Sequence, residues 1–182
     1  TVIIPTYQHA DSLPGCLDRI LGGSYKNIEV IVVNDGSTDN TRDILSQYSH
    51  DDRLITVWQD NQGSNAARMT GYGLASGEYL LFCDADVVMH VNMIQVMYDT
   101  LQDFPEASYT YAGFKFGWKR FRPLEFDADR LRKHNYIHTT SLIRRKDFPG
   151  FDLDVKRLQD WDVWLTMLEQ GNEGVMIPAE LF

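Results

Sequence analysis

The sequence has little cysteine and no long apolar run. Its two cysteines, Cys16 and Cys83, lie far apart and in no metal-ligand spacing, so we interpret both as small core residues of a protein in a reducing, cytoplasmic compartment. No apolar stretch approaches the roughly 18 residues that would span a membrane, and no charged leader precedes an apolar segment. The chain begins inside an apolar run without an initiator methionine and is expected to be a fragment of a longer protein.

Basic residues are also too few for a protein that binds nucleic acid. The 182 residues include 17 Lys and Arg against 26 Asp and Glu, a net charge of −9, whereas a surface that follows a phosphate backbone needs a basic excess. Between residues 113 and 146, however, ten basic residues occur with only three acids. This basic 113–146 segment is expected to meet an anionic acceptor or the inner surface of a membrane, and a solvated face is the alternative. Its basic residues are Lys115, Lys119, Arg120, Arg122, Arg130, Arg132, Lys133, Arg144, Arg145 and Lys146.

Two common nucleotide-binding motifs are missing. The sequence contains no GxGxxG and no GxxxxGK[ST], and PTYQHA follows the first apolar run instead. Those glycine-rich turns wrap the phosphates of dinucleotides and of nucleoside triphosphates. The sequence therefore argues against NAD-type and P-loop chemistry.

Apolar runs rich in β-branched residues alternate with helical patterns along the first hundred residues. Continuous apolar runs predict strands buried on both faces, and the helices between them supply the crossovers of a parallel sheet. The pattern predicts an α/β fold in one domain, with a mostly parallel central sheet and helices on both faces. Strands are expected at 1–4, 28–33, 54–58, 79–83, 108–112 and 137–143, and helices at 12–21, 40–48, 64–75, 92–101 and 160–170.

Polar residues follow the apolar runs where the strands should end, and open parallel sheets bind ligands at those ends. The fourth run ends in Asp84-Ala85-Asp86, and side-chain alternation in an extended chain places both carboxylates on one side. Two such carboxylates suit a hard divalent cation, Mg²⁺ or Mn²⁺, that takes phosphate oxygens as further ligands. Asp127 and Asp129 repeat the tripeptide in a charged, helix-like segment, and we interpret that copy as structural.

Four stretches together carry a family resemblance. TVIIPTYQHADSL, IEVIVVNDGSTDNT, DNQGSNAARMTGYGLASGEYLLFCDADV and RLQDWDVWLTMLEQG follow one another in the order and spacing of the family 2 glycosyltransferases, so that the chain resembles this family over essentially its whole length. The resemblance implies the GT-A fold, in which residues 1–106 bind a nucleotide sugar and residues 107–182 form the acceptor side. The nucleotide is expected to be UDP.

The resemblance also implies roles in binding the nucleotide. Pro5, Thr6 and Tyr7 match the exit of the first strand, where the base is held. Asp35 matches the acid that accepts a hydrogen bond from the ring N–H of uracil, and the alternative is a turn residue in its Asn-Asp-Gly stretch. We expect Asp39 to cap the helix that follows.

A second matching element lies after the third strand. Asn61, Gly63 and Arg68 match an NxGxxxAR element of the family. Glycine lets the backbone approach a ligand, and the arginine either reaches a phosphate or only pairs with Asp84.

The signature acids and the general base complete the implied site. By resemblance, Asp84 helps to hold the ribose and Asp86, separated from it by Ala85, ligates the metal that bridges the diphosphate. Asp160 matches the general base that deprotonates the acceptor hydroxyl, although a helix-capping Asp is the alternative. The family's Glu before this base is Gln159 here, which leaves the role of that position open.

Other candidate residues carry no motif. Trp118 is either a sugar-stacking platform or a half-buried aromatic residue. The five histidines form no motif, and none follows Asp160, where family members often place a metal-ligating His.

The resemblance thus implies a metal-dependent, inverting glycosyltransferase of the hexosyl- or N-acetylhexosaminyl-transferase type. It would use Mg²⁺ or Mn²⁺ and move a sugar to a hydroxyl in cell-surface polysaccharide or glycoconjugate synthesis. Nothing in the sequence says whether the acceptor is a sugar, a lipid-linked molecule or a protein. One alternative is a non-catalytic module that binds nucleotide sugars. Another is a sugar nucleotidyltransferase, but that class carries a glycine-rich loop after the first strand and PTYQHA is not one.

Overall fold

Four strands from the amino-terminal half form the parallel part of one sheet. In the computed structural model, which describes residues 1–182, all pairings among them are parallel, in the order β3-β2-β1-β4. Strands β1 and β2 are buried along their whole length, as their continuous apolar runs predict, whereas β3 at the edge is only partly buried. The bounds are β1 (Val2–Thr6), β2 (Val30–Asp35), β3 (Leu54–Gln59) and β4 (Tyr79–Phe82).

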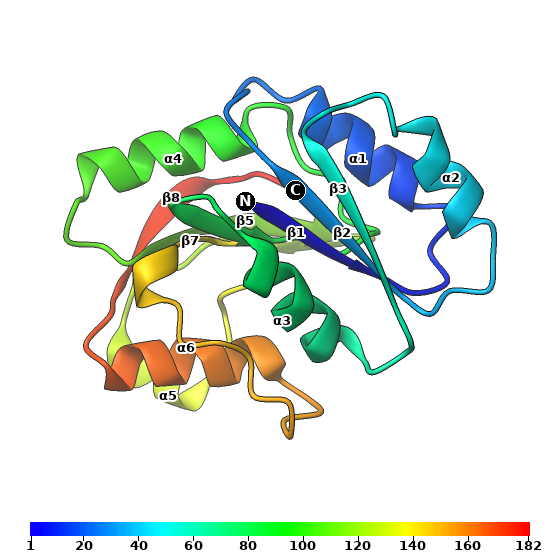
Figure 1. Cartoon of the computed structure of the whole chain (residues 1–182). Helices are drawn as coiled ribbons and strands as arrows, with labels where there is room; N and C mark the ends of the chain where they lie inside the picture. The colour runs from blue at the N-terminus through cyan, green and yellow to red at the C-terminus, as the bar shows by residue number, and fades with distance from the viewer.

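Helices cover both faces of this sheet (Figure 1). Helices α1, α2 and α4 pack on one face and contribute to the larger apolar core, while α5 and α6 pack with the aromatic residues of the second core on the other face, where α3 also lies. The predicted crossover helices are all present. The bounds are α1 (Leu13–Leu21), α2 (Thr41–Gln47), α3 (Ser64–Leu74), α4 (Met93–Asp103), α5 (Ala128–Lys133) and α6 (Gln159–Glu169).

The carboxy-terminal half adds antiparallel strands to the sheet. Strand β7 (Leu142–Arg144) runs antiparallel between β4 and β5 (Tyr109–Phe116). Strand β8 (Gly174–Glu180) runs parallel to β5, and β6 (Lys119–Phe121) forms a hairpin with β5. The sheet is therefore parallel on one side and mixed on the other.

One expectation for this half needs correction, and three elements were not expected. Only the last residues of the strand expected at 137–143 are extended, because 142–144 alone pair with β4 and β5. Strands β6 and β8 were not expected, since the first is three exposed residues long and the second contains a proline. A single turn of 3₁₀ helix, η1 (Arg145–Asp147), follows β7.

The second core fixes the position of α6 against the sheet. Trp164 of α6 stacks on Tyr109 of β5 with ring centroids 4.8 Å apart, and its indole Nε1 donates to the carbonyl of Ile137 at 2.9 Å. The ring is 1% exposed. Packing of a buried aromatic ring with a satisfied polar group holds the start of α6 close to β4 and α3.

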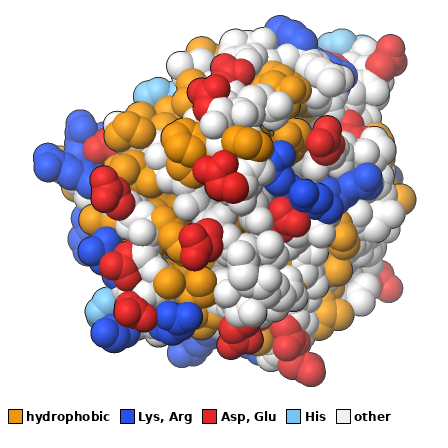
Figure 2. Space-filling view, turned by 90° about the vertical axis from the view of Figure 1, so that its left-hand side faces the viewer, with side chains coloured by type: hydrophobic (Ala, Val, Ile, Leu, Met, Phe, Trp, Pro, Cys, Tyr) orange, Lys and Arg blue, Asp and Glu red, His pale blue; other side chains and the backbone are white.

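None of the helices is both long and apolar enough to cross a membrane. Figure 2 shows the side of the molecule where the loop between α4 and β5 lies, and acidic, basic and hydrophobic side chains are interspersed there. No single sign of charge covers that face.

Candidate active site

A cavity of about 530 Å³ opens where β1, β2 and β4 end. The ten residues that the sequence singled out for nucleotide-sugar binding line it, together with His9 and Ser64, which no sequence motif indicated. Asp160 does not line this cavity, although its neighbour Gln159 contacts Ser64 and Arg68. The ten residues are Pro5, Thr6, Tyr7, Asp35, Asn61, Gly63, Arg68, Asp84, Ala85 and Asp86.

Asp35 at the end of β2 is 3% exposed and holds the loop that follows β3. Its Oδ1 accepts from Gln59 Nε2 at 2.8 Å and from the Gln62 N–H at 2.9 Å, and its Oδ2 accepts from the Gly63 N–H at 2.8 Å. Gly63 has φ +91°, a conformation that favours glycine. The carboxylate thus shapes the loop that carries Asn61 and Gly63.

Arg68 connects the end of β4 to the start of α6. Its guanidinium is buried, pairs with Asp84 Oδ1 at 2.7 Å and donates to Gln159 Oε1 at 3.4 Å. The pairing alternative for Arg68 is therefore present in the structure. Since the same residue lines the cavity, this pairing leaves it in reach of a ligand.

Two buried polar atoms in the cavity residues have no partner. Thr6 Oγ1 and Arg68 Nε are both buried, and neither makes a hydrogen bond within residues 1–182. Buried polar groups are almost always paired. These atoms are two of the four such side-chain atoms in residues 1–182, and both can donate a hydrogen bond to a polar ligand.

The acids of Asp84-Ala85-Asp86 fit a hard divalent cation. Asp86 is exposed and has no ion-pair partner, and Asp84 keeps one carboxylate oxygen beyond the one that Arg68 engages. Residues 1–182 hold no group of three or more metal-ligating side chains. A cation at these two acids would take its other ligands from a diphosphate and water, as Mg²⁺ and Mn²⁺ do.

Asp160 is the second residue of α6 and does not cap it. The cap position is Leu158, which has a left-handed backbone, φ 55°. Asp160 Oδ2 accepts from Asn135 Nδ2 at 3.0 Å and Oδ1 accepts from the Trp161 N–H at 2.9 Å. The alternative that Asp160 caps the helix is therefore wrong. Its position in the first turn of α6 still favours an ionised carboxylate.

His138 is a residue near the acids that the sequence did not reveal. The N–H of Thr140 donates to its Nδ1 at 3.0 Å, so the neutral ring carries its proton on Nε2. Burial lowers the pKa of His138, and Asp84 and Asp160 act in the opposite direction. The ring lies 4.7 Å from that of Phe114, and tertiary packing alone brings it here.

The remaining sequence candidates lie elsewhere. Asp127 caps α5 by accepting from the Arg130 N–H at 2.7 Å, and Asp129 pairs with Arg132 at 2.9 Å, so this second tripeptide is structural as interpreted. Trp118 is fully exposed, which rules out a half-buried position.

Asp39 acts at the start of α2. Its Oδ1 accepts from the N–H of Thr41, the first residue of the helix, at 3.1 Å, although Asn40 occupies the cap position. Its Oδ2 also accepts from the Ala10 N–H at 3.0 Å. Asp39 therefore ties the first loop to α2.

The two cysteines are buried core residues, as interpreted, but they are neighbours. Their sulfur atoms lie 3.8 Å apart, and both side chains are inaccessible to solvent. A hydrogen bond with the neighbouring Cys16, together with burial, raises the pKa of Cys83. Cys83 directly precedes the first acid of the site, so this contact supports the end of β4.

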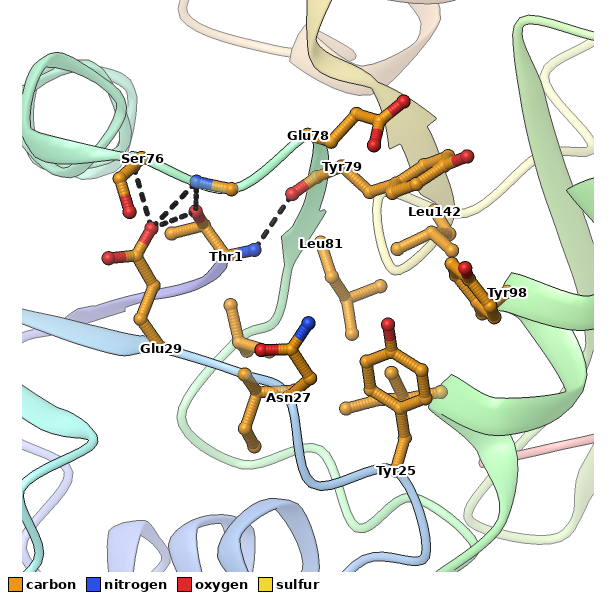
Figure 3. Close-up of a pocket in the computed structure, with 14 residues that line it drawn as sticks. Thr1, Tyr25, Asn27, Glu29, Ser76, Glu78, Tyr79, Leu81, Tyr98 and Leu142 are labelled. Atoms are coloured by element: carbon orange, nitrogen blue, oxygen red, sulfur yellow. Dashed lines mark hydrogen bonds between the residues drawn. The ribbon is translucent and has the colours of Figure 1, made fainter.

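A second cavity, of about 240 Å³, lies at the opposite ends of the strands (Figure 3). Thr1, Glu29 and Ser76 meet at one side of it and Tyr25 and Tyr98 at the other. Burial alone would raise the pKa of Glu29, but hydrogen bonds from Thr1 and from the N–H groups of Ser76 and Gly77 lower it to about 2. This cavity is separate from the one that Asp35, Asp84 and Asp86 line.

Comparisons with known structures show the fold. The chain matches S. aureus TarS in complex with UDP-GlcNAc with a TM-score of 0.82 and 19% identity, over 99% of this chain and 56% of that chain. It matches the mannosyltransferase PcManGT of Pyrobaculum calidifontis in complex with GDP-Man and Mn²⁺ with a TM-score of 0.78 and 22% identity, over 97% and 54% of the two chains. The fold is that of the GT-A glycosyltransferases.

Sequence comparison identifies the family. The model described as glycosyl transferase family 2 matches residues 1–151, and the chain belongs to that family. It is 40% identical over 105 residues to glycosyltransferase GlyA of Streptococcus pneumoniae, and this match covers 57% of this chain and 15% of GlyA. It is 27% identical over 183 residues to the putative teichuronic acid biosynthesis glycosyltransferase TuaG of Bacillus subtilis, and this match covers 94% of this chain and 72% of TuaG. The chain spans only 15% of GlyA and 35% of glycosyltransferase GlyG of Streptococcus pneumoniae, which is less than two-thirds of the length of these two relatives.

Proposed function

We propose that this chain is a metal-dependent, inverting glycosyltransferase that uses a UDP-sugar as donor and Mg²⁺ or Mn²⁺ as cofactor. The observation that carries the proposal is the gathering, in one cavity at the strand ends, of two acids, a buried arginine and an unpartnered threonine hydroxyl. A diphosphate with its cation supplies partners for the two acids and the arginine, and the nucleotide base supplies one for the threonine hydroxyl. The complexes of TarS with UDP-GlcNAc and of PcManGT with GDP-Man and Mn²⁺ support such a donor.

The nucleotide is assigned to the β1 and β2 side of the cavity. Thr6 and Tyr7 hold the base, and Pro5 lines the cavity beside them from within β1. A carboxylate has about four acceptor positions, and three of those of Asp35 are used by the protein. One position then remains for the N–H of uracil, so Asp35 combines loop anchoring with base selection.

The diphosphate is assigned to the β4 side. Asp84 orients the ribose and Asp86 holds the cation, which on binding supplies charge neutralisation for the departing diphosphate. Arg68 fixes Asp84, and we assign its unpartnered Nε as a hydrogen-bond donor to a phosphate. Asn61 and Gly63 bring backbone close to the donor.

Asp160 is assigned as the general base. The acceptor hydroxyl oxygen attacks the anomeric carbon, its proton passes to Asp160, and the bond from that carbon to the diphosphate oxygen breaks. One displacement inverts the anomeric configuration. Asn135 holds the carboxylate of Asp160 by its hydrogen bond and so orients the base.

The acceptor is assigned to residues 107–182, and the product to a cell-surface polysaccharide or glycoconjugate. The similarity to TuaG, a putative teichuronic acid enzyme, supports this assignment. We place the reaction in the cytoplasm at the inner face of the membrane, where two free thiols only 3.8 Å apart remain reduced.

Thermal unfolding with UDP, GDP, CDP and dTDP, each with and without Mn²⁺, tests donor binding. A nucleotide at a hundredfold excess over its Kd adds roughly 2.7 kcal/mol of stability. We expect a Mn²⁺-dependent shift with UDP that Asp86→Ala abolishes. Asp129→Ala is the matched control because it removes one acid from the second Asp-Ala-Asp, on α5. If none of the four nucleotides shifts the melting temperature, the proposal is contradicted.

Asp160→Asn separates catalysis from binding. Loss of a general base lowers turnover by roughly 10² to 10⁴, while the UDP-dependent shift should stay within experimental error of the unmodified chain. If Asp160→Asn transfers or hydrolyses the donor as fast as the unmodified chain, Asp160 is not the base. If the unmodified chain binds the donor but never turns it over with any hydroxyl acceptor or water, the chain is a binding module.

A further inference from the structure

The β5–β6 hairpin has one aromatic and one cationic face. Phe114 lies opposite Phe121, with ring centroids 4.5 Å apart, and stacks on Phe182. Lys115 lies opposite Arg120 on the alternate positions. Like charges directly opposite each other on one face of a sheet destabilise it. The cationic pair therefore carries a cost that nothing in the hairpin itself offsets.

The cationic face lines a cavity of about 890 Å³. Lys115, Arg120 and Arg122 all contribute to it, and the only acid in its lining is Glu180, which pairs with Arg120 at 3.2 Å. Lys115 and Arg122 have no ion-pair partner anywhere in residues 1–182. Two uncompensated cations in one cavity favour an anion of more than one charge.

The cavity lined by Lys115, Arg120 and Arg122, called the cationic cavity, is adjacent to the donor cavity at the ends of β1, β2 and β4. Asp84 and Asp86 line the donor cavity, while Val88 and His90, a few residues further along the same loop, line the cationic one. Because each extended residue spans at most about 3.6 Å, the Cα atoms of Asp86 and His90 lie within about 14 Å of each other. An acceptor of a few units can reach from one cavity to the other.

We infer that the cavity lined by Lys115, Arg120 and Arg122 binds a phosphate, diphosphate or phosphodiester group of the acceptor. This inference rests on the proposed function, because it takes the hydroxyl that attacks the sugar to belong to the same molecule. Guanidinium groups match phosphate oxygens in pairs, and the lysine adds charge. The hairpin would thereby select acceptors that carry a phosphate near the reacting hydroxyl.

Binding of inorganic pyrophosphate in the presence of EDTA tests the site. Without a divalent cation, the acids of the donor cavity repel pyrophosphate, so calorimetric titration reports on the cationic cavity. The triple variant Lys115→Gln/Arg120→Gln/Arg122→Gln is called the pocket variant. We expect it to bind pyrophosphate at least tenfold more weakly than the unmodified chain. The matched control removes three charges from the same basic segment, Arg130→Gln/Arg132→Gln/Lys133→Gln on α5, and should stay within twofold of the unmodified chain.

Stability provides a second readout on the same variants. Removing like charges that face each other relieves repulsion, and the exposed Arg120–Glu180 pair contributes little. The melting temperature of the pocket variant should therefore not fall. Weaker binding in a variant of unchanged or higher stability identifies a binding site rather than a damaged fold. Absence of pyrophosphate binding, or equal weakening by both triple variants, would overturn the inference.

Vesicles distinguish the acceptor from a lipid surface. Sedimentation with vesicles of phosphatidylglycerol and phosphatidylcholine should not depend on the three pocket residues. If the pocket variant loses vesicle binding while pyrophosphate binding persists, the surface contacts membranes and the assignment to the acceptor is wrong. Failure of the proposed function would appear in a separate measurement, as the absence of a melting-temperature shift with UDP and Mn²⁺ in the unmodified chain. If the proposed function is right, the unmodified chain shows this shift and the pocket variant shows it too.

Discussion

Asp35→Asn tests whether one buried carboxylate holds the loop of the donor site together. Asparagine keeps the shape of the side chain but replaces one acceptor oxygen by an NH₂ group. The remaining oxygen can still accept hydrogen bonds from Gln59 and Gln62. The N–H of Gly63, however, then faces the new NH₂ group, which is also a donor, and loses its hydrogen bond. A hydrogen bond to a charged group contributes about 1.5–3 kcal/mol, and a buried donor without a partner costs about 1–3 kcal/mol.

The expected destabilisation is about 2–4 kcal/mol, less than the sum of these figures because the loop relaxes toward water. For a chain of this length each kcal/mol lowers the melting temperature by about 2–4 °C, so the total shift is roughly 5–15 °C. Urea unfolding measures the free energy. Hydrogen exchange at the amides of Gln62 and Gly63 measures the local opening directly.

Asp60→Asn is the control, because Asp60 is an exposed acid in the same loop. It should change the free energy of unfolding by no more than about 0.5 kcal/mol. A destabilisation of that small size for Asp35→Asn, with the two amides still protected, would refute the anchoring role. Loss of UDP binding with the loop intact would instead leave base selection as the single role of Asp35.

Three other expectations follow from contacts in the structure. The Arg68→Met and Asp84→Asn changes should be non-additive in urea unfolding, with a coupling of about 0.5–3 kcal/mol, and additive effects would mean that their 2.7 Å pair contributes nothing. Because the pKa of Glu29 is lowered to about 2 in the folded chain from 4.5, its contribution to stability is present above pH 4.5 and is lost as the pH falls toward 2. The stability difference between the unmodified chain and Glu29→Gln should therefore shrink over that window, and a constant difference would contradict it. Cys16 and Cys83 are inaccessible, so iodoacetamide should modify both only after denaturation, and rapid labelling of the native chain would show that the end of β4 opens.

The amino-terminal half could be predicted closely from the sequence. Its strands are continuous apolar runs and its helices have clear periodicity, so each element is encoded within its own residues. The strand-end rule for parallel sheets then placed Thr6, Asp35, Asp84 and Asp86 at one edge, where the structure has them. The only additional knowledge needed was that parallel neighbours end on the same side.

The carboxy-terminal half depended on tertiary structure. Strand β6 is three exposed residues, and β8 takes its extended form from pairing with β5 rather than from an apolar period of its own. The position of β7 between β4 and β5 likewise follows from packing.

The same division holds within the site. The sequence determined which acids stand at the strand ends, because local patterns fix where a strand stops. Only the tertiary structure brought Asn135 to Asp160 and His138 toward the acids. It also placed two cysteines, 67 residues apart, in contact. Contacts between distant residues carry no local periodicity, and they form because the sheet and its two apolar cores pack as a whole.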